Sequence, residues 1–167
     1  FGKNKKRKFL KFLGCLVILG VIVYIVINIK IKNIYVKGNK ILSDQEIIEL
    51  AGIENYPKLF SIPIVKLENK IKLNRLVSKV KVRKNIFGRV DIEVSEYNIL
   101  LKDEVSKNVY LSNGENVTLD EEIVGVPTLI NVVDTEVLKL FLEKLDTIDK
   151  DILAKISEIE YKPNEYD

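Results

Sequence analysis

The first strong pattern in the chain is a long uncharged segment. Residues 12–29, between Lys11 and Lys30, are almost all Leu, Ile, Val, Gly or aromatic. A helix of this length reaches roughly 27 Å, which is close to the hydrocarbon thickness of a bilayer. The pattern predicts a transmembrane helix over residues 12–29, with Cys15 as an inert residue inside it. The alternatives are a core helix of a soluble protein, which usually keeps a polar stripe, and a cleaved signal peptide, for which no small-residue cleavage site follows.

A strand and a short helix are predicted next. Apolar and polar residues alternate over residues 33–39, which is typical of a strand running into a turn. Ser43 and Glu46 have the spacing of a capping box, in which each side chain bonds the backbone N–H of the other residue. Gly52 stands where a helix ends in the left-handed conformation. The sequence therefore predicts a helix over Asp44–Ala51.

A second helix and a hairpin complete this half of the chain. Pro63 suits the first position of a helix that ends near Asn74 and buries Ile64, Leu67 and Ile71. Residues 79–85 and 89–95 both alternate with period 2, and a three-residue loop with Gly88 in the left-handed conformation joins them. The expected register places Val82 opposite Ile92 and Val80 opposite Val94 in the core, with the pairs Arg83–Asp91 and Lys81–Glu93 on the other face.

The second half of the chain has shorter elements. We expect strands at residues 99–102, 109–112, 117–119, 129–133 and 156–161. Asn113 and Gly114 predict a two-residue hairpin turn. Asp134 can cap a helix with Val137, Leu138, Phe141, Leu142 and Leu145 on its buried face, and a shorter helix is expected at residues 149–155. Asp120, Glu121 and Glu122 are interpreted as a polar loop.

The composition restricts the chemistry. The 167 residues include one Cys and no His, Met or Trp. Histidine-dependent catalysis, zinc sites of the usual ligands and an intrachain disulfide are therefore excluded. The absence of Met, with Phe1 leading, is typical of a processed product or a fragment. A membrane-tethered hydrolase with paired carboxylates remains an alternative, but the acidic group Asp44, Glu46 and Glu49 is expected in a first helical turn, where the helix dipole favours acids. We expect no catalytic residue, no metal and no cofactor.

The charge is distributed unevenly. The chain has 27 Lys and Arg against 24 Asp and Glu, and residues 1–11 carry only basic charges, at Lys3, Lys5, Lys6, Arg7, Lys8 and Lys11. The remainder is net negative, which gives no reason to expect a nucleic-acid partner. By the positive-inside rule, this basic segment stays in the cytoplasm and the residues after about Lys30 lie outside.

Several short motifs, in their order along the chain, resemble those of one protein family. They are Val36 with Gly38 and Asn39, the helix start from Leu42 to Ile47, Ala51 to Ile53, and the hairpin from Val80 to Glu96. This ordered set, behind a basic segment and a single membrane helix, resembles the POTRA domain of the FtsQ/DivIB bacterial cell-division proteins. Such proteins often carry a Pro after the basic pair of the hairpin, where this chain has Asn85.

The resemblance implies an α+β protein with four parts. These are a cytoplasmic basic tail (1–11), a transmembrane helix (12–29), a POTRA domain of order β-α-α-β-β (32–97) and a mixed α/β FtsQ-type β-domain, incomplete at its C-terminal side (98–167). It further implies a non-enzymatic single-pass scaffold in the bacterial cytoplasmic membrane at the division septum. Its implied partners are divisome proteins of the FtsL, FtsB or DivIC type. A POTRA-bearing component of outer-membrane translocation is the other alternative, but that class carries a long β-barrel.

The resemblance also indicates where a partner binds. In a POTRA-like order the strand of residues 79–84 lies at the sheet edge, since the strand of residues 89–95 separates it from residues 34–36. An edge strand offers free N–H and C=O groups to another chain, and lysines are the usual guard against indiscriminate pairing. The candidate partner-binding residues are Lys79, Val80, Lys81, Val82, Arg83 and Lys84.

Overall fold

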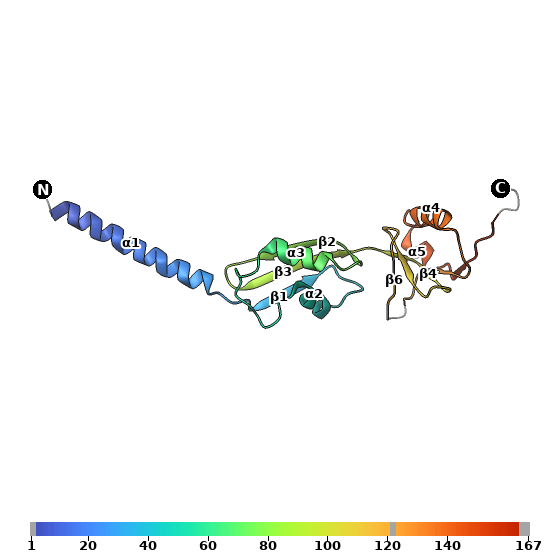
Figure 1. The fold of residues 1–167 in the computed structure, drawn as a ribbon, viewed down its shortest axis with the longest axis horizontal. Helices are drawn as coiled ribbons and strands as arrows, with labels where there is room; N and C mark the ends of the chain where they lie inside the picture. The colour runs from blue at the N-terminus through green and yellow to red at the C-terminus, as the bar shows by residue number, and fades with distance from the viewer. Residues whose placement is uncertain (1–2, 121–122, 164–167) are drawn as a thin grey trace. The chain divides into compact units, whose positions relative to one another are not determined.

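The computed structural model describes residues 3–120 and 123–163. They begin with the helix α1 (Lys3–Ile27), shown in blue in Figure 1. Within the described residues, Arg7–Ile27 is the one stretch of helix long and apolar enough to cross a membrane, with a mean hydropathy of 2.7 and no buried part. The helix starts well before the apolar segment because Lys and Arg are good helix formers and nothing in the basic segment interrupts it.

The described residues form two compact units. The first contains the residues up to Asn74 together with Lys79–Ser95, and the second contains Arg75–Ser78 together with the residues from Glu96 onward. Each unit has its own sheet, and each is described separately below.

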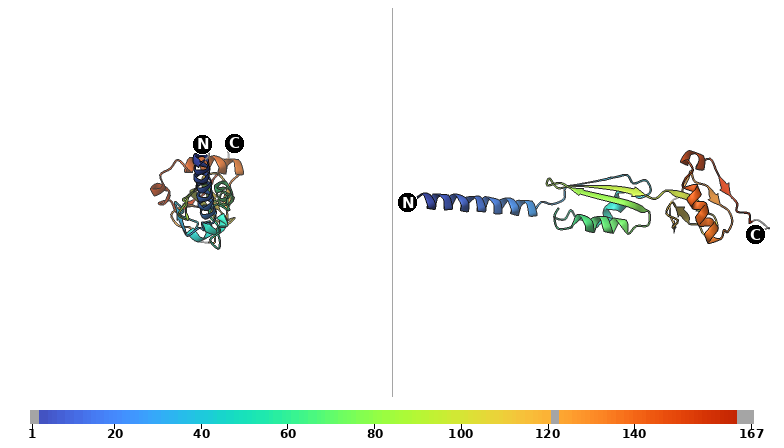
Figure 2. Two further views of the ribbon diagram at one scale, coloured as in Figure 1. Left: turned by 90° about the vertical axis from the view of Figure 1, so that its left-hand side faces the viewer. Right: turned by 90° about the horizontal axis from the view of Figure 1, so that it is seen from above.

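The first unit is a three-stranded sheet with two helices on one face, as Figure 2 shows. The strand order is β1-β3-β2, and β1 runs parallel to β3 with Lys37 opposite Glu93. The elements are β1 (Asn33–Lys37), α2 (Asp44–Ala51), α3 (Ile64–Lys72), β2 (Val77–Lys84) and β3 (Arg89–Glu96). Its core includes the fully buried side chains of Ile47, Ile53, Leu59, Leu67, Ile71, Val90 and Ile92. The predicted order of elements and the edge position of β2 are confirmed.

The predicted helix caps are mostly confirmed. Ser43 and Glu46 form the full capping box of α2, and Gly52 ends that helix with φ +67°. Pro63 lies one position earlier than predicted, as the N-cap of α3 with φ −60° and ψ 143°. The extended ψ is compatible with a flanking residue but not with a helical one, so the prediction of a first-turn Pro63 is wrong by one residue.

The hairpin β2–β3 closes as predicted. The N–H of Asn85 donates to the carbonyl of Arg89 over 3.0 Å, and the N–H of Gly88 donates to the carbonyl of Asn85 over 3.2 Å. Gly88 has φ +87°, the left-handed conformation that this three-residue loop requires.

The second unit contains a five-stranded sheet of order β6-β5-β4-β7-β8. Its strands are β4 (Ile99–Asp103), β5 (Val109–Leu111), β6 (Asn116–Val117), β7 (Thr128–Leu129) and β8 (Glu158–Ile159), and its helices are α4 (Thr135–Leu145) and α5 (Lys150–Leu153). One buried cluster holds it together, made of Leu100, Leu101, Leu129, Leu138, Leu142, Leu145 and Leu153. Both units mix helices and strands, so the predicted α+β class is confirmed.

Three details of the second unit differ from expectation. The hairpin β5–β6 has a three-residue loop, because the N–H of Leu111 donates to the carbonyl of Glu115 over 2.8 Å. Asp134 is at the N-cap of α4 but makes no capping hydrogen bond, and Val137 of the predicted buried face is 37% exposed. Strand β7 is shorter than predicted because the Asn131 side chain takes over the pairing, donating to the carbonyl of Tyr161 over 2.6 Å and accepting its N–H over 2.8 Å.

Candidate interaction surfaces

The predicted partner-binding residues lie on the edge strand β2. Lys79, Lys81 and Arg83 are exposed, Val80 and Lys84 are half-buried, and Val82 is buried in the core. The strand therefore presents its cations outward and its valines inward, as period-2 alternation requires. The structure brings the six predicted residues together on one strand but gives them different surroundings.

The edge is partly covered at Val82. The backbone N–H of Val82 donates to Oε1 of Glu68 on α3 over 2.8 Å. That donor points away from β3 and would otherwise be available to a strand from another chain. Glu68 was missed at the sequence level. The signal was present, since Glu68 stands four residues after Ile64, a position where an amphipathic helix normally places another apolar residue.

Lys84 has a structural role as well. Its Nζ donates to the carbonyl of Leu59 over 2.8 Å and also to the carbonyl of Ile62. Partial burial lowers the pKa of the Lys84 ammonium. Lys84 therefore fastens the loop between α2 and α3 to the end of β2, and the exposed cations of the strand are Lys79, Lys81 and Arg83.

The outer face of the sheet carries more positive than negative charge. A shallow hollow on it is lined by Tyr35, Lys37, Lys81, Arg83, Arg89, Asp91 and Glu93. Nε of Arg89 donates to Oδ1 of Asp91 over 2.8 Å, and the guanidinium lies 4.2 Å above the ring of Tyr35. This hydrogen bond lowers the pKa of Asp91.

Besides the hydrogen bond from Arg89, the nearby charge of Arg83 lowers the pKa of Asp91, and the acids of this face also have partners that the sequence did not predict. Asp91 pairs with Arg89 of its own strand, and Glu93 pairs with Lys37 of β1, with Nζ and Oε1 3.6 Å apart. The prediction considered only the β2–β3 ladder, whereas β3 is central and the parallel register with β1 brings Lys37 opposite Glu93. Lys81 and Arg83 lie on the side where the sheet ends, and Arg83 shares the negative charge of Asp91 with Arg89 and Lys37.

The three acidic residues of α2 all have structural partners, but only Asp44 and Glu46 lie in its first turn, so the predicted first-turn position of Glu49 is wrong. Oε2 of Glu46 accepts the N–H of Ser43 over 2.7 Å, and the hydrogen bonds from the Ser43 side chain and backbone lower the pKa of Glu46. Oδ1 of Asp44 accepts from the Asn39 side chain over 2.9 Å, and Oε1 of Glu49 accepts from Gln45 over 2.9 Å. These bonds account for Asp44 and Glu46 as parts of the helix start and for Glu49 as part of an i,i+4 pair along the helix.

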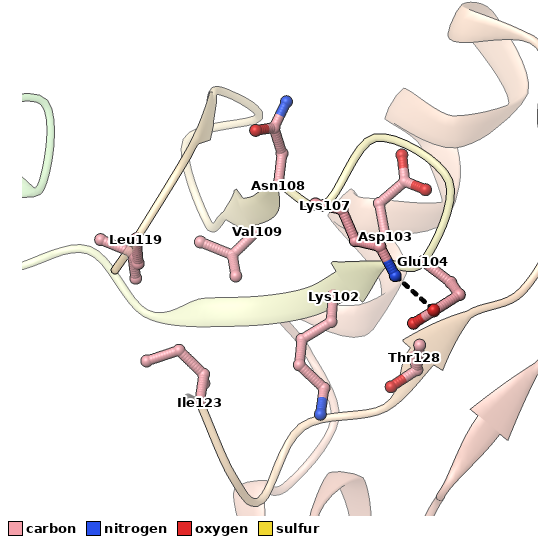
Figure 3. Close-up of a pocket in the computed structure, with 9 residues that line it drawn as sticks. All are labelled: Lys102, Asp103, Glu104, Lys107, Asn108, Val109, Leu119, Ile123 and Thr128. Carbon is pink, nitrogen blue, oxygen red and sulfur yellow. Dashed lines mark hydrogen bonds and ion pairs between the residues drawn. The ribbon is translucent and has the colours of Figure 1, made fainter. Parts of the chain in front are cut away.

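A second hollow lies in the second unit, beside the turn between β4 and β5 (Figure 3). Oδ2 of Asp103 accepts from the Ser106 hydroxyl over 2.7 Å, and Oδ1 accepts the N–H of Val105 over 2.9 Å. Partial burial raises the pKa of Asp103, but hydrogen bonds led by that from Ser106 outweigh it and lower the pKa. Lys107 of the same turn forms an ion pair with Glu104.

Two features that often mark reaction sites are a metal-ligand group and an unpartnered buried polar atom. In the described ranges 3–120 and 123–163, no three His, Cys, Asp or Glu side chains are close enough to hold a metal ion, and no buried side-chain polar atom lacks a hydrogen-bond partner. The predicted polar loop at Asp120 extends into residues 121–122, which lie outside the described residues.

The β1-α2-α3-β2-β3 order with its parallel β1–β3 pair defines a class of protein. Residues 29–97 match the family model described as "POTRA domain, FtsQ-type". The chain is 33% identical over 156 residues to the cell division protein DivIB of Bacillus subtilis (strain 168), an alignment that covers 88% of this chain and 58% of that protein. It is 28% identical over 177 residues to DivIB of Erysipelothrix rhusiopathiae (strain Fujisawa), covering 96% of this chain and 63% of that protein.

Residues 29–97 are thus a POTRA domain of the FtsQ type. The resemblance to the FtsQ/DivIB family of bacterial cell-division proteins, predicted from the sequence, is confirmed by these matches. A further DivIB, from Staphylococcus pseudintermedius (strain HKU10-03), is 26% identical over 136 residues, with 80% of this chain and 46% of that protein covered. The chain spans about half to two thirds of the length of the curated relatives it matches.

Proposed function

We propose that this chain acts in bacterial cell division as a membrane-anchored scaffold. The observation that carries the proposal is an FtsQ-type POTRA match that begins at residue 29, directly after the apolar stretch Arg7–Ile27. The domains we assign are a basic tail (1–11), a membrane helix (12–29), the POTRA domain (32–97) and a β-domain (98–167). The scaffold docks divisome membrane proteins of the FtsL, FtsB or DivIC type at the septum and catalyses no reaction.

The POTRA domain and β-domain lie outside the cytoplasmic membrane in this proposal. The support is the basic segment before α1, which favours a cytoplasmic N-terminal side. The single Cys15 makes the orientation testable in intact cells after Cys15→Ser removes the background thiol. Lys107→Cys on an exposed turn should react with a membrane-impermeant maleimide, and Lys8→Cys should react only after permeabilisation. The opposite labelling pattern would reverse the proposed topology.

The proposed docking surface is the edge strand β2 with its exposed cations. Lys79, Lys81 and Arg83 present positive charge beside a sheet edge, while Glu68 occupies the Val82 donor. A partner segment with acidic side chains would pair with the edge on the side of Val80 and meet these cations. Electrostatic complementarity of this kind directs association and selects the partner.

Charge reversal tests this surface without disturbing the core. Lys81→Glu with Arg83→Glu leaves Val80 and Val82 in place, and Lys66→Glu with Lys72→Glu on exposed positions of α3 is the matched control. Full-length protein carrying the first pair should capture FtsL-, FtsB- or DivIC-type proteins poorly from membranes, whereas the control should capture them normally. Equal capture by both variants would show that β2 is only a guarded edge.

A further inference from the structure

Two loops of the POTRA domain expose large apolar side chains. Tyr56 and Phe60 lie between α2 and α3, and they are 56% and 50% exposed. Ile86 and Phe87 form the tip of the β2–β3 hairpin, and they are 59% and 77% exposed. Contiguous exposed apolar side chains of this size mark an interaction surface more often than single ones do. These four side chains are therefore candidates for contact with another molecule or surface.

Both loops are hydrogen-bonded to the residues that follow α1. The N–H of Leu59 donates to the carbonyl of Ile29 over 2.7 Å, and the N–H of Ile31 donates to the carbonyl of Pro57 over 3.0 Å. On the opposite side of this segment, the N–H of Lys32 donates to the carbonyl of Gly88 over 2.7 Å. The segment that leaves α1 is therefore bound between the two loops that carry the apolar side chains.

These bonds hold the loops close to the end of the helix. Helix α1 ends at Ile27, two residues before Ile29. Two extended residues span at most about 7 Å. The polar headgroup zone on each side of a bilayer is of comparable depth, roughly 5–8 Å. If α1 spans the membrane, the two loops lie at the depth of the headgroups.

Lysines at the same place favour an anionic surface. Lys30 and Lys58 face each other in an isolated antiparallel bridge, and both are exposed. Like charges directly opposite in a β pair destabilise it. Nζ of Lys58 donates to Oδ1 of Asn28 over 2.8 Å, which does not neutralise either charge. Phosphate groups of anionic lipids at this depth would neutralise both.

The loop between α2 and α3 is held in place rather than free. Lys84 fastens it through the carbonyls of Leu59 and Ile62. Asn55 and Tyr56 have φ +61° and +49°, a left-handed conformation that is strained for non-glycine residues. The loop holds two residues in this conformation and exposes an aromatic ring. Its binding conformation is therefore preorganised.

We propose that Tyr56, Phe60, Ile86 and Phe87 form a membrane rim, which inserts into the interfacial zone of the outer leaflet around the exit of α1. Lys30 and Lys58 contact lipid phosphates beside it. Aromatic side chains are favoured at this depth because their rings combine apolar area with tolerance of a polar setting. This inference rests on the proposed function in two respects, the membrane-spanning role of α1 and its orientation. The rim would fix the POTRA domain against the bilayer.

Single tryptophan reporters test the rim, since the chain has no Trp of its own. The full chain is reconstituted in vesicles of phosphatidylcholine with and without phosphatidylglycerol, and indole quenching by brominated lipid is measured. Phe87→Trp reports on the rim. Leu73→Trp, at an 83% exposed position nine residues beyond the start of α3, is the matched control. Leu19→Trp, within α1, reports on membrane insertion itself.

We expect Leu19→Trp and Phe87→Trp to be quenched several-fold more strongly than Leu73→Trp. Quenching at Phe87→Trp should increase with phosphatidylglycerol, and Lys30→Gln with Lys58→Gln should remove that increase. Quenching at Leu19→Trp with a water-exposed Phe87→Trp would overturn the rim and leave the anchor intact. The rim would also be overturned if the indole of Phe87→Trp stayed in water in vesicles alone and was buried only after a partner protein was added. Absence of quenching at Leu19→Trp would instead refute the membrane anchor and the rim with it.

Discussion

Two hairpin loops of this chain share one backbone geometry but have different surroundings. In β2–β3 the N–H of Asn85 donates to the carbonyl of Arg89, and in β5–β6 the N–H of Leu111 donates to the carbonyl of Glu115. Each loop ends in a left-handed glycine, Gly88 with φ +87° or Gly114 with φ +83°. A Cβ on Gly88 would lie 2.6 Å from the carbonyl oxygen of Lys30, whereas a Cβ on Gly114 would meet nothing within 4 Å.

The comparison separates what local sequence determines from what packing adds. Each turn combines a left-handed glycine with an asparagine whose Oδ1 accepts the N–H two residues on, although Asn85 precedes its loop and Asn113 lies inside its loop. Both turns are therefore built by local chemistry. The first turn is also a tertiary contact, because the carbonyl of Gly88 accepts the N–H of Lys32 directly after α1. We therefore expect substitutions in the first loop to have larger effects than the same substitutions in the second.

The largest effect is expected for Gly88→Ala. The new methyl group meets both the left-handed strain and the backbone oxygen of Lys30, which cannot move aside without breaking the bonds to residues 29–33. We expect a loss of about 3 kcal/mol, the upper range for a single substitution. Hydrogen exchange of the β3 amides measures it for the first unit alone. A loss below 1 kcal/mol would mean that the loop is not fixed against Lys30.

Gly114→Ala is the counterpart in the second unit. With open space around it, the substitution should cost only the left-handed strain, about 1 kcal/mol. Hydrogen exchange of the β5 amides measures this loss. A cost as large as that of Gly88→Ala would contradict the claim that the surroundings, and not the turn, make the difference.

Removing the asparagine of each loop should have an effect no larger than that of Gly114→Ala. Oδ1 of Asn85 accepts the N–H groups of Phe87 over 3.0 Å and of Arg89 over 3.2 Å, whereas Oδ1 of Asn113 accepts only that of Glu115 over 3.1 Å. We expect Asn85→Ala to cost about 1 kcal/mol and Asn113→Ala about half as much, since exposed hydrogen bonds contribute little each. Hydrogen exchange of the β3 amides measures the loss for Asn85→Ala, and hydrogen exchange of the β5 amides measures the loss for Asn113→Ala. The reverse order would contradict the bond assignment.

The smallest effect is expected at the third turn, between β4 and β5, which a carboxylate closes. Hydrogen bonds lower the pKa of Asp103, so its ionised form stabilises the fold above the pKa of the unfolded chain, about 3.9, and the contribution is lost as the pH falls through the folded pKa. Asp103→Asn should flatten this acid-side loss in the second unit while costing less than about 1 kcal/mol at neutral pH. An unchanged pH profile would show that Asp103 contributes no such linkage.

The sequence predicted best what short-range chemistry determines. Ser43 with Glu46 specifies the start of α2, and the period-2 pattern around Gly88 specifies the hairpin. Strand β7 was predicted too long because the pattern at residues 129–133 does not reveal that the Asn131 side chain replaces the backbone ladder. This side-chain pairing depends on Tyr161, which is thirty residues away in sequence.

The candidate surface was predictable only in part. The exposed cations of β2 follow from alternation, and the edge position followed from the resemblance to the POTRA domain. The Glu68 contact with Val82 and the Lys37 pairing with Glu93 join elements that sequence spacing does not connect. The apolar loops at Tyr56 and Phe87 also needed the structure, because only the hydrogen bonds to residues 29–32 place them at the end of α1.

The central claim is that this chain is a membrane-anchored scaffold of cell division. The most direct measurement uses cells depleted of their own copy of the protein, in which the full-length protein is supplied as a fluorescent fusion. The account predicts a fluorescent band at the division septum and restored division. The variant with Lys81→Glu and Arg83→Glu should remain in the membrane, but cells that carry it should divide poorly. Uniform membrane fluorescence with no restoration of division by the unaltered protein would contradict the account.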